Sequence, residues 1–184
     1  MPDAIQSAVA VLKEDGVIAY PTEAVFGLGC DPNSDPALQR LLDLKQRPAE
    51  KGLIIIAADL EQVLPYIQPL TDAQRKKLQA SWPGRVTWLL PVNPAVSKLL
   101  VGEHNSIAAR VTPHPVASEL CRQFGKPLVS TSANLSGREP ARSVGEVREQ
   151  FGDQLDAVID GEVDMDGKPS EIRDLISDKI IREG

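Results

Sequence analysis

The sequence predicts an α/β domain in which helices cover both faces of a twisted, open, mixed sheet. Helical patterns alternate with short apolar runs along most of the chain. The run 53–57 is apolar without alternation, which is typical of a strand covered on both faces. The last three candidate strands follow one another without an intervening helix, so we expect the sheet to be mixed in direction near its C-terminal edge.

The first elements follow from capping and apolar spacing. A helix is expected after Asp3, a candidate N-cap, because apolar residues recur at helical spacing through 5–12, and Gly16 is placed to end it. The apolar run 17–20 predicts a strand that ends at Pro21, because proline has no N–H for a strand ladder. A turn is expected to follow.

Residues 24–29 contain two glycines two positions apart, which permit close backbone approach or positive φ. They lack the third glycine of a dinucleotide fingerprint, so a nicotinamide-binding fold is not indicated. Asp35 and Pro36 predict the N-cap and first residue of a second helix, whose last turn holds Lys45. Pro48 closes that segment.

The remaining elements are read in the same way, and the run 53–57 should be the central strand. Capping-box patterns at 71–74 and 143–146 start two helices, and Thr112-Pro113 starts another that Gly125 ends. Residues 163–168, rich in Asp and Gly, predict a loop. The other expected strands are 86–90, 106–111, 128–131, 157–159, 171–175 and 179–181.

Composition suits a single domain over residues 1–184, since 42% of the residues are hydrophobic and 25% are charged. The net charge of -6 argues against a surface that wraps nucleic acid as a whole, and leaves room for a local basic cleft. No apolar run reaches the roughly 20 residues that span a bilayer, and no signal-peptide pattern opens the chain. With two unpaired cysteines, a reduced cytoplasmic protein without membrane contact is expected.

Two polar stretches interrupt the apolar runs and form the candidate site. Lys45 and Arg47 stand at the end of the second predicted helix, and the segment 130–134, Ser-Thr-Ser-Ala-Asn, follows a predicted buried strand. Cations beside hydroxyl and amide groups suit an anionic ligand. The chain has no G-x-x-x-x-G-K-[ST] motif, so side chains instead of a glycine loop would hold a phosphate. We expect both cations to be exposed.

Each stretch also fits a structural role. Lys45 and Arg47 fit a solvated helix end, and the segment 130–134 fits an Asx or Ser/Thr turn with a helix cap. His114, between two prolines, fits capping or surface better than catalysis. The histidines and cysteines lack metal-ligand spacing, and no G-x-S-x-G occurs. Neither a structural zinc nor a serine nucleophile is therefore indicated.

Five motifs resemble the YrdC-like family in order and spacing, over nearly the whole chain. They are residues 20–29 (YPTEAVFGLG), Lys45-x-Arg47, residues 82–84 (Trp-Pro-Gly), residues 109–111 (Ala-Arg-Val) and residues 130–134. The chain is most similar to the short, single-domain bacterial members of that family. This resemblance implies the family's twisted, open α/β sheet with a large, positively charged concave cavity.

The resemblance also implies an activity. Such an enzyme joins L-threonine and bicarbonate to the AMP part of ATP, releases pyrophosphate, and so begins formation of N6-threonylcarbamoyladenosine at position 37 of tRNA. The nucleotide would bring Mg2+, with no metal ligands from the protein. Implied partners are the other tRNA threonylcarbamoylation proteins and tRNA or double-stranded RNA.

Roles for individual residues are implied by the same resemblance. The catalytic K-x-R and S-x-N motifs fall on Lys45, Arg47, Ser132 and Asn134. The residues implied for ATP are Lys45, Arg47, Ser106, Asn134, Arg142 and Arg182. Those implied for threonine are Thr22, Arg110, Ser132 and Ser170.

The alternative reading is an RNA-binding module that acts in tRNA or ribosome maturation without its own chemistry. The acidic overall balance counts against it. A pure RNA binder would lose affinity steeply between about 50 and 200 mM salt and would show no threonine-dependent ATP consumption.

Overall fold

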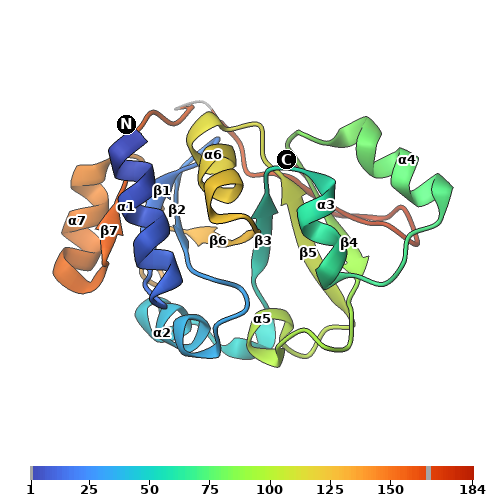
Figure 1. The fold of residues 1–184 in the computed structure, drawn as a ribbon, viewed down its shortest axis with the longest axis horizontal. Coiled ribbons are helices and arrows are strands. Elements are labelled where there is room, and N and C mark those ends of the chain that lie inside the picture. The colour runs from blue at the N-terminus through green and yellow to red at the C-terminus, as the bar shows by residue number, and fades with distance from the viewer. Residues whose placement is uncertain (1, 165–166) are drawn as a thin grey trace.

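The computed structural model describes residues 2–164 and 167–184. Its strands form one mixed sheet in the order β7-β1-β2-β6-β3-β5-β4-β8-β9 (Figure 1). The strands are β1 (Ile18–Pro21), β2 (Phe26–Gly29), β3 (Ile54–Ala57), β4 (Val86–Pro91), β5 (Ser106–Val111), β6 (Leu128–Ser132), β7 (Ala157–Val158), β8 (Glu171–Asp174) and β9 (Ile180–Arg182). The predicted open α/β sheet is confirmed, and β3 lies at its centre as expected.

Strand direction is mixed near the C-terminal edge, as expected, where β8 pairs parallel with β4 and antiparallel with β9, and it is mixed in the rest of the sheet as well. The pairs β1·β2, β2·β6 and β6·β3 are antiparallel at one end, while β3·β5 in the centre is parallel. At the other end β4 pairs antiparallel with β5 and parallel with β8. The sequence pattern missed β2, which adds an antiparallel strand between β1 and β6.

The missed strand β2 depends on glycines that let other groups approach. A Cβ at Gly29 would lie 2.5 Å from the Val129 carbonyl oxygen and 2.7 Å from the Tyr20 ring. The Tyr20 hydroxyl donates to that same carbonyl oxygen at 3.0 Å, so the ring crosses the strand at Gly29. Neither Gly27 nor Gly29 has positive φ, so close approach is the reason for glycine here.

Seven α-helices are present among the described residues. They are α1 (Pro2–Lys13), α2 (Asp35–Lys45), α3 (Leu60–Val63), α4 (Asp72–Ser81), α5 (Lys98–Val101), α6 (Pro115–Phe124) and α7 (Val144–Phe151). None of them has the length and apolar character needed to cross a membrane. Short 3-10 turns at Ala49–Lys51, Leu64–Tyr66 and Gly152–Gln154 complete the regular structure.

Several helix starts differ from the expected positions. Asp3 is not an N-cap but lies in the first turn of α1, and Ser34, not Asp35, caps α2 by accepting from the Ala37 amide. Helix α6 begins at Pro115 instead of at Thr112-Pro113, because the His114 side chain caps it. These shifts of one to three positions arise because several adjacent residues can each cap a helix.

The capping box predicted at the start of α4 is confirmed, since Thr71 and Gln74 each bond the other's backbone amide. At α7 only half of the box forms. Ser143 accepts from the Glu146 amide, while the Glu146 carboxylate accepts from the backbone of Arg142 instead.

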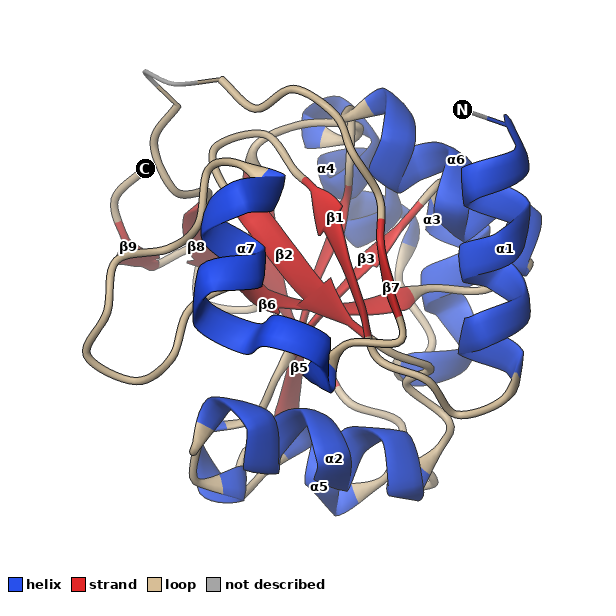
Figure 2. Ribbon diagram, turned by 90° about the vertical axis from the view of Figure 1, so that its left-hand side faces the viewer, coloured by secondary structure: helices blue, strands red, loops and turns tan. Residues whose placement is uncertain are grey.

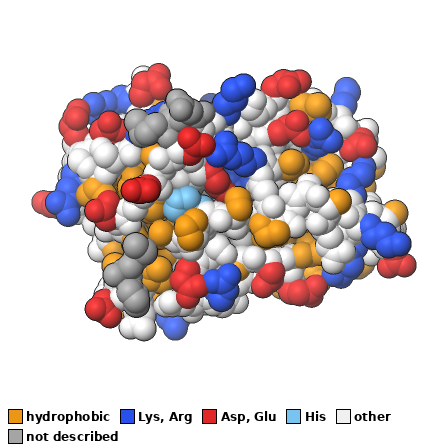
Figure 3. Space-filling model, turned by 90° about the horizontal axis from the view of Figure 1, so that it is seen from above, with side chains coloured by type: hydrophobic (Ala, Val, Ile, Leu, Met, Phe, Trp, Pro, Cys, Tyr) orange, Lys and Arg blue, Asp and Glu red, His pale blue; other side chains and the backbone are white. Residues whose placement is uncertain are grey.

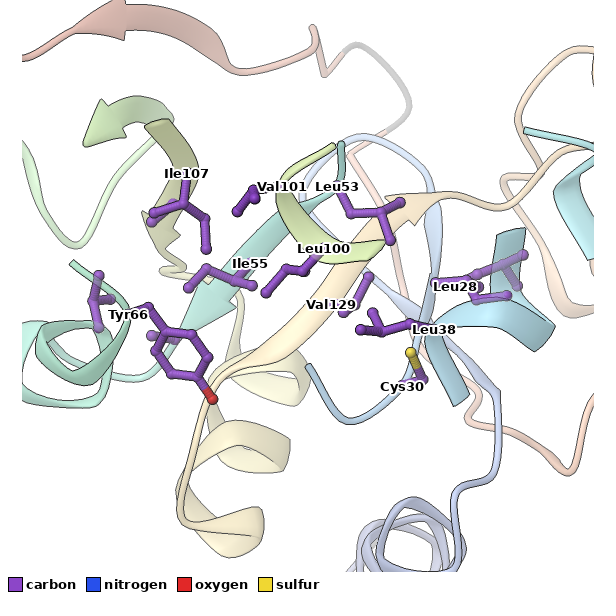
Figure 4. Close-up of a cluster of buried hydrophobic side chains, with 14 of the residues drawn as sticks. Leu28, Cys30, Leu38, Leu53, Ile55, Tyr66, Leu100, Val101, Ile107 and Val129 are labelled. Atoms are coloured by element: carbon purple, nitrogen blue, oxygen red, sulfur yellow. The ribbon is translucent and has the colours of Figure 1, made fainter. Parts of the chain in front are cut away.

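Buried side chains form two cores, one on each face of the sheet. Helices lie on both sides of the strands (Figure 2). The larger core lies between the sheet and helices that include α2, α5 and α7, and Figure 4 shows Leu38 and Leu100 from these helices packed with Ile55 and Val129. The smaller core lies beneath α1 and α6. Helices therefore cover both faces, as predicted.

Helix α6 leaves part of its face of the sheet uncovered. Ile56 of β3 and Leu128 of β6 are buried in the smaller core, beneath that helix. Two residues along each strand, Ile54 and Ser130 point to the same face, because side chains alternate along a strand. Both of these line a cavity instead. The cavity thus lies beside the part of β3 and β6 that packs in the smaller core with α6.

Candidate active site

A cavity of about 460 Å3 opens over the uncovered part of the sheet. Its walls come from the turn after β1, the residue two positions past α2, the strands β3, β5 and β6, and the segments 139–142 and 167–170. The lining residues are Thr22, Glu23, Ala24, Val25, Phe26, Gly27, Arg47, Leu53, Ile54, Arg85, Arg110, Ser130, Thr131, Ser132, Glu139, Pro140, Arg142, Gly167, Lys168, Pro169, Ser170 and Arg182.

Cationic side chains outnumber carboxylates in this lining. The cations are Arg47, Arg85, Arg110, Arg142, Lys168 and Arg182, against the carboxylates Glu23 and Glu139. The chain as a whole carries a net charge of -6, so the lining departs from the average composition. Seen from above, acidic and basic side chains lie beside one another around the edge of the molecule (Figure 3).

Lys45 is buried, and the expectation that it is exposed is wrong. Its side chain has 7% of its surface exposed and is absent from the cavity lining. The ammonium donates to the Ser132 backbone oxygen at 2.5 Å, and to the backbone and side-chain oxygens of Asn134 at 2.9 and 3.2 Å. Burial first, and then the nearby charge of Arg47, lowers the pKa of Lys45 to about 8.

Arg47 reaches the cavity from just beyond the end of α2. The backbone turns there at Gln46, which has φ 49° and whose amide donates to the carbonyl oxygens of Asp43 and Leu42. The Arg47 guanidinium is partly buried, and one terminal nitrogen donates to the Gly52 carbonyl oxygen at 2.9 Å. Its Nε finds no acceptor among the described residues, and burial lowers its pKa.

Ser132 and Asn134 lie at the end of β6 and differ in position. Ser132 lines the cavity, and its hydroxyl donates to the Asn134 side-chain oxygen at 2.6 Å. The Asn134 amide nitrogen donates to the carbonyl oxygens of Leu135 and Arg138 at 3.1 and 2.9 Å. Asn134 is not a lining residue, so its side chain shapes the loop that presents Ser132.

Thr22 is buried at the turn after β1 and lines the cavity. Its hydroxyl donates to the Val25 carbonyl oxygen at 2.6 Å, which closes the turn. Because that single hydroxyl proton is used, Thr22 can only accept a hydrogen bond from a ligand.

Arg110 and Glu23 form an ion pair in the cavity wall. The two side chains have 12% and 10% of their surface exposed, and Arg110 Nη2 lies 3.1 Å from Glu23 Oε2. The other oxygen of Glu23 accepts from the Thr112 hydroxyl at 2.7 Å. Arg110 Nε has no acceptor among the described residues.

Ser170 and Arg182 close the side of the cavity formed by the last two strands. The Ser170 hydroxyl lies 2.8 Å from that of Thr87, and both residues are buried. Arg182 donates to the Ser170 carbonyl oxygen through two nitrogens, at 3.2 and 2.7 Å. Partial burial, and after it the charge of Arg110, lowers the pKa of Arg182. Both residues line the cavity.

The structure thus brings together seven of the ten residues implied by the resemblance. Those in the lining are Thr22, Arg47, Arg110, Ser132, Arg142, Ser170 and Arg182. Lys45 and Asn134 stand behind the wall. Ser106 lies outside the cavity lining, at the opposite end of β5 from Arg110, although both point to the same face of the sheet.

Sequence reasoning missed four charged residues of the lining, namely Glu23, Arg85, Glu139 and Lys168. Glu23 stands beside Thr22 within the motif at 20–29, so its place in that motif was the available signal. Arg85 and Lys168 are exposed and carry no pattern that separates them from other surface cations.

Residues 10–184 match the family model Sua5_yciO_yrdC, described as "Telomere recombination". A protein of Photobacterium profundum named threonylcarbamoyl-AMP synthase is 51% identical over 184 residues, which cover 99% of this chain and 100% of that protein. One of the same name from Klebsiella pneumoniae is 54% identical over 184 residues, which cover 99% of this chain and 96% of that protein.

Among solved structures, P. abyssi Sua5 complexed with L-threonine aligns with a TM-score of 0.86 and 30% identity. The match covers 92% of this chain and 50% of that one, so this chain spans about half of the length of that Sua5. The structure of E. coli YciO also aligns with a TM-score of 0.86, at 28% identity, covering 100% of this chain and 90% of that chain.

Proposed function

The chain belongs to the Sua5_yciO_yrdC family, and on that basis we propose that it makes L-threonylcarbamoyl-AMP from L-threonine, bicarbonate and ATP. It is a threonylcarbamoyl-AMP synthase, a nucleotidyltransferase that carries out the first step towards N6-threonylcarbamoyladenosine in tRNA. The observation that carries the proposal is full-length identity of 51 and 54% to two proteins of that name, in a chain whose motif residues converge on one cavity.

The reaction makes and breaks few bonds. Carbon dioxide from bicarbonate adds to the threonine nitrogen, which gives a carbamate after loss of a proton. A carbamate oxygen then attacks the α-phosphorus of ATP, and the bond to the β-phosphate oxygen breaks to release pyrophosphate. No protein nucleophile is needed, so the protein contributes by holding two anions together and by stabilising charge on the transferring phosphate.

The cavity wall offers groups for each part of this task. Arg47 lines the cavity, and its Nη1 makes no hydrogen bond among the described residues, so it is placed to donate to the phosphates. Ser132 lines the same cavity, where its hydroxyl, which donates to Asn134, can only accept from a ligand. Arg110 offers a planar guanidinium for the carboxylate of threonine. Lys45 acts indirectly, because its ammonium holds the backbone that carries Ser132.

Magnesium would enter with the nucleotide. Within residues 2–164 and 167–184, no group of three or more His, Cys, Asp or Glu side chains is arranged to hold a metal ion. A Mg2+ ion bound mainly by phosphate oxygens and water needs few protein ligands. Metal titration of the nucleotide complex measures whether the two lining carboxylates, Glu23 and Glu139, contribute to Mg2+ binding.

The proposal extends to partners in the same pathway. The product is an activated threonylcarbamoyl group, and another protein must transfer it to adenosine in tRNA.

The test of the activity is incubation of the full chain with ATP, labelled L-threonine and bicarbonate. We expect a threonine-containing adenylate and equimolar pyrophosphate. ATP consumption that is the same without threonine would contradict the proposal.

A further inference from the structure

Glu23 is a carboxylate in a cavity whose other charged groups are mostly cations. Only 10% of its side chain is exposed, whereas Glu139, the other carboxylate among the described lining residues, is exposed to solvent. A buried negative charge beside an anion-binding wall weakens the binding of phosphate or bicarbonate through Coulomb repulsion. Its presence therefore calls for a ligand group that carries positive charge.

The substrate of the proposed function contains such a group. L-threonine is a zwitterion, in which an ammonium and a carboxylate are bonded to one carbon. Arg110 and Glu23 offer the complementary pair, with Arg110 Nη2 and Glu23 Oε2 3.1 Å apart in the same wall. Each can form a charge-assisted hydrogen bond with the opposite end of the zwitterion.

Both side chains keep capacity for these bonds. A carboxylate has about four acceptor sites. The structure uses Oε1 of Glu23 for the Thr112 hydroxyl and Oε2 for Arg110, so acceptor capacity remains on both oxygens. Arg110 donates from Nη2 to Glu23, and its Nη1 makes no hydrogen bond among the described residues.

We propose that Glu23 binds the ammonium group of the amino-acid substrate while Arg110 binds its carboxylate. This inference rests on the proposed function and assigns to Glu23 the selection of α-amino acids over hydroxy acids. The Thr112 hydroxyl bond holds the Glu23 carboxylate in orientation, so that recognition does not depend on a mobile side chain.

The test measures binding, without turnover, on the full chain by calorimetry. The ligands are L-threonine and the 2,3-dihydroxybutanoate of the same configuration, in which a hydroxyl replaces the ammonium. We expect the wild type to bind L-threonine at least about 10-fold more tightly, because one charge-assisted bond is lost with the analogue. In Glu23→Gln we expect that preference to fall to about 3-fold or less, with the anionic analogue bound at least as tightly as by the wild type because the repelling carboxylate is gone.

Glu139→Gln is the matched control, because it removes the other lining carboxylate at an exposed position. It should keep the wild-type preference. Equal loss of preference in both variants would mean a general charge effect and would overturn the inference, as would an undiminished preference in Glu23→Gln.

The wild-type comparison alone keeps the inference falsifiable if Glu23→Gln fails to fold. Equal affinity of the wild type for both ligands would overturn it. Failure of the proposed function is a separate result, since the wild type would then bind neither ligand, with or without ATP.

Discussion

The ammonium nitrogen of Lys45 lies 2.9 Å from the backbone oxygen of Asn134. One side chain from the last turn of α2 thereby holds the loop that follows β6. The two polar stretches that stand far apart in the sequence meet at this point, and Lys45 joins them from behind the cavity wall instead of from within it.

The first prediction concerns Lys45→Met, which keeps an apolar stem and removes the ammonium. We expect the free energy of unfolding to fall by about 1–3 kcal/mol, because the oxygens of Ser132 and Asn134 lose their donor in a buried place. Pyrophosphate release should fall by about 10-fold or more, since the loop carrying Ser132 is no longer fixed. Denaturant titration and a pyrophosphate assay measure the two effects, and wild-type values in both would contradict this role.

The second prediction is the pH dependence of that stability. The pKa of Lys45 is about 8 in the folded chain and lies near its ordinary value of about 10.4 in the unfolded chain. Between these values the unfolded chain binds more protons, so the free energy of unfolding of the wild type rises with pH relative to Lys45→Met. A gain on the order of 2 kcal/mol is expected from pH 7 to about pH 10. A flat difference between the two proteins over this interval would show that the pKa is not lowered.

The third prediction concerns Arg47→Ala. Arg47 lines the cavity, so kcat/KM for ATP should fall by about 10²-fold, as when one charge-stabilising donor is removed. Arg47→Lys should restore little of the lost kcat/KM. An ammonium lacks the fork geometry by which a guanidinium can donate to the Gly52 oxygen and to phosphate at the same time.

Arg40→Ala is the matched control for Arg47. Arg40 lies on α2 itself, but its guanidinium pairs with Asp156 at 2.5 Å and is no part of the cavity lining. The Arg40→Ala variant should keep kcat/KM for ATP within about 2-fold of the wild-type value, since exposed ion pairs contribute little to stability. Equal losses in the two variants would refute a specific role for Arg47.

Sequence patterns predicted the parts of the fold that depend on local chemistry. The strands expected at 53–57 and 106–111 and the capping box at Thr71 are correct, because burial and capping are determined by a few adjacent residues. The strand β2 was missed because its glycines are needed for the close approach of the Tyr20 ring, which belongs to a different strand. The four-residue helices α3 and α5 are too short to show a period.

The candidate site, too, was predicted only in part. The motif residues that converge on the cavity were predicted through resemblance, whereas the burial of Lys45 follows from a loop 87–89 positions away and is invisible to helix periodicity. Glu23 was overlooked because a glutamate is usually a surface residue, although its place within the motif at 20–29 was a signal. Its significance comes from Arg110 and Thr112, which only the fold brings to it.

The fourth prediction concerns Thr22 and the choice of amino acid. The Thr22 hydroxyl donates to Val25, so towards a ligand it can only accept, and the hydroxyl of threonine must be the donor. Valine has no such donor, and we expect little turnover with it. In Thr22→Val the ratio of kcat/KM values for threonine over valine should fall by about 10-fold or more. Equal turnover of both amino acids by the wild type would refute this role.

The fifth prediction separates a structural from a binding contribution of Ser170. Its hydroxyl pairs with that of Thr87, which has none of its surface exposed. Ser170→Ala leaves the Thr87 hydroxyl buried without this partner, at a cost of about 1–3 kcal/mol in the free energy of unfolding. Thr87→Val should cost less, because Ser170 lines the cavity, where water can replace the lost partner.

The two variants should also differ in substrate binding. If the Ser170 hydroxyl contacts threonine, Ser170→Ala raises KM for threonine by about 5-fold or more, while Thr87→Val leaves it within about 2-fold. Thr87 is not among the lining residues, so it has no direct access to a ligand. An equal rise of KM in both variants would mean that Ser170 acts only through the packing of β8 against β4. The double variant Ser170→Ala/Thr87→Val tests whether the two hydroxyls stabilise each other. Its loss in the free energy of unfolding should be smaller than the sum of the two single losses, because neither hydroxyl is then left without its partner.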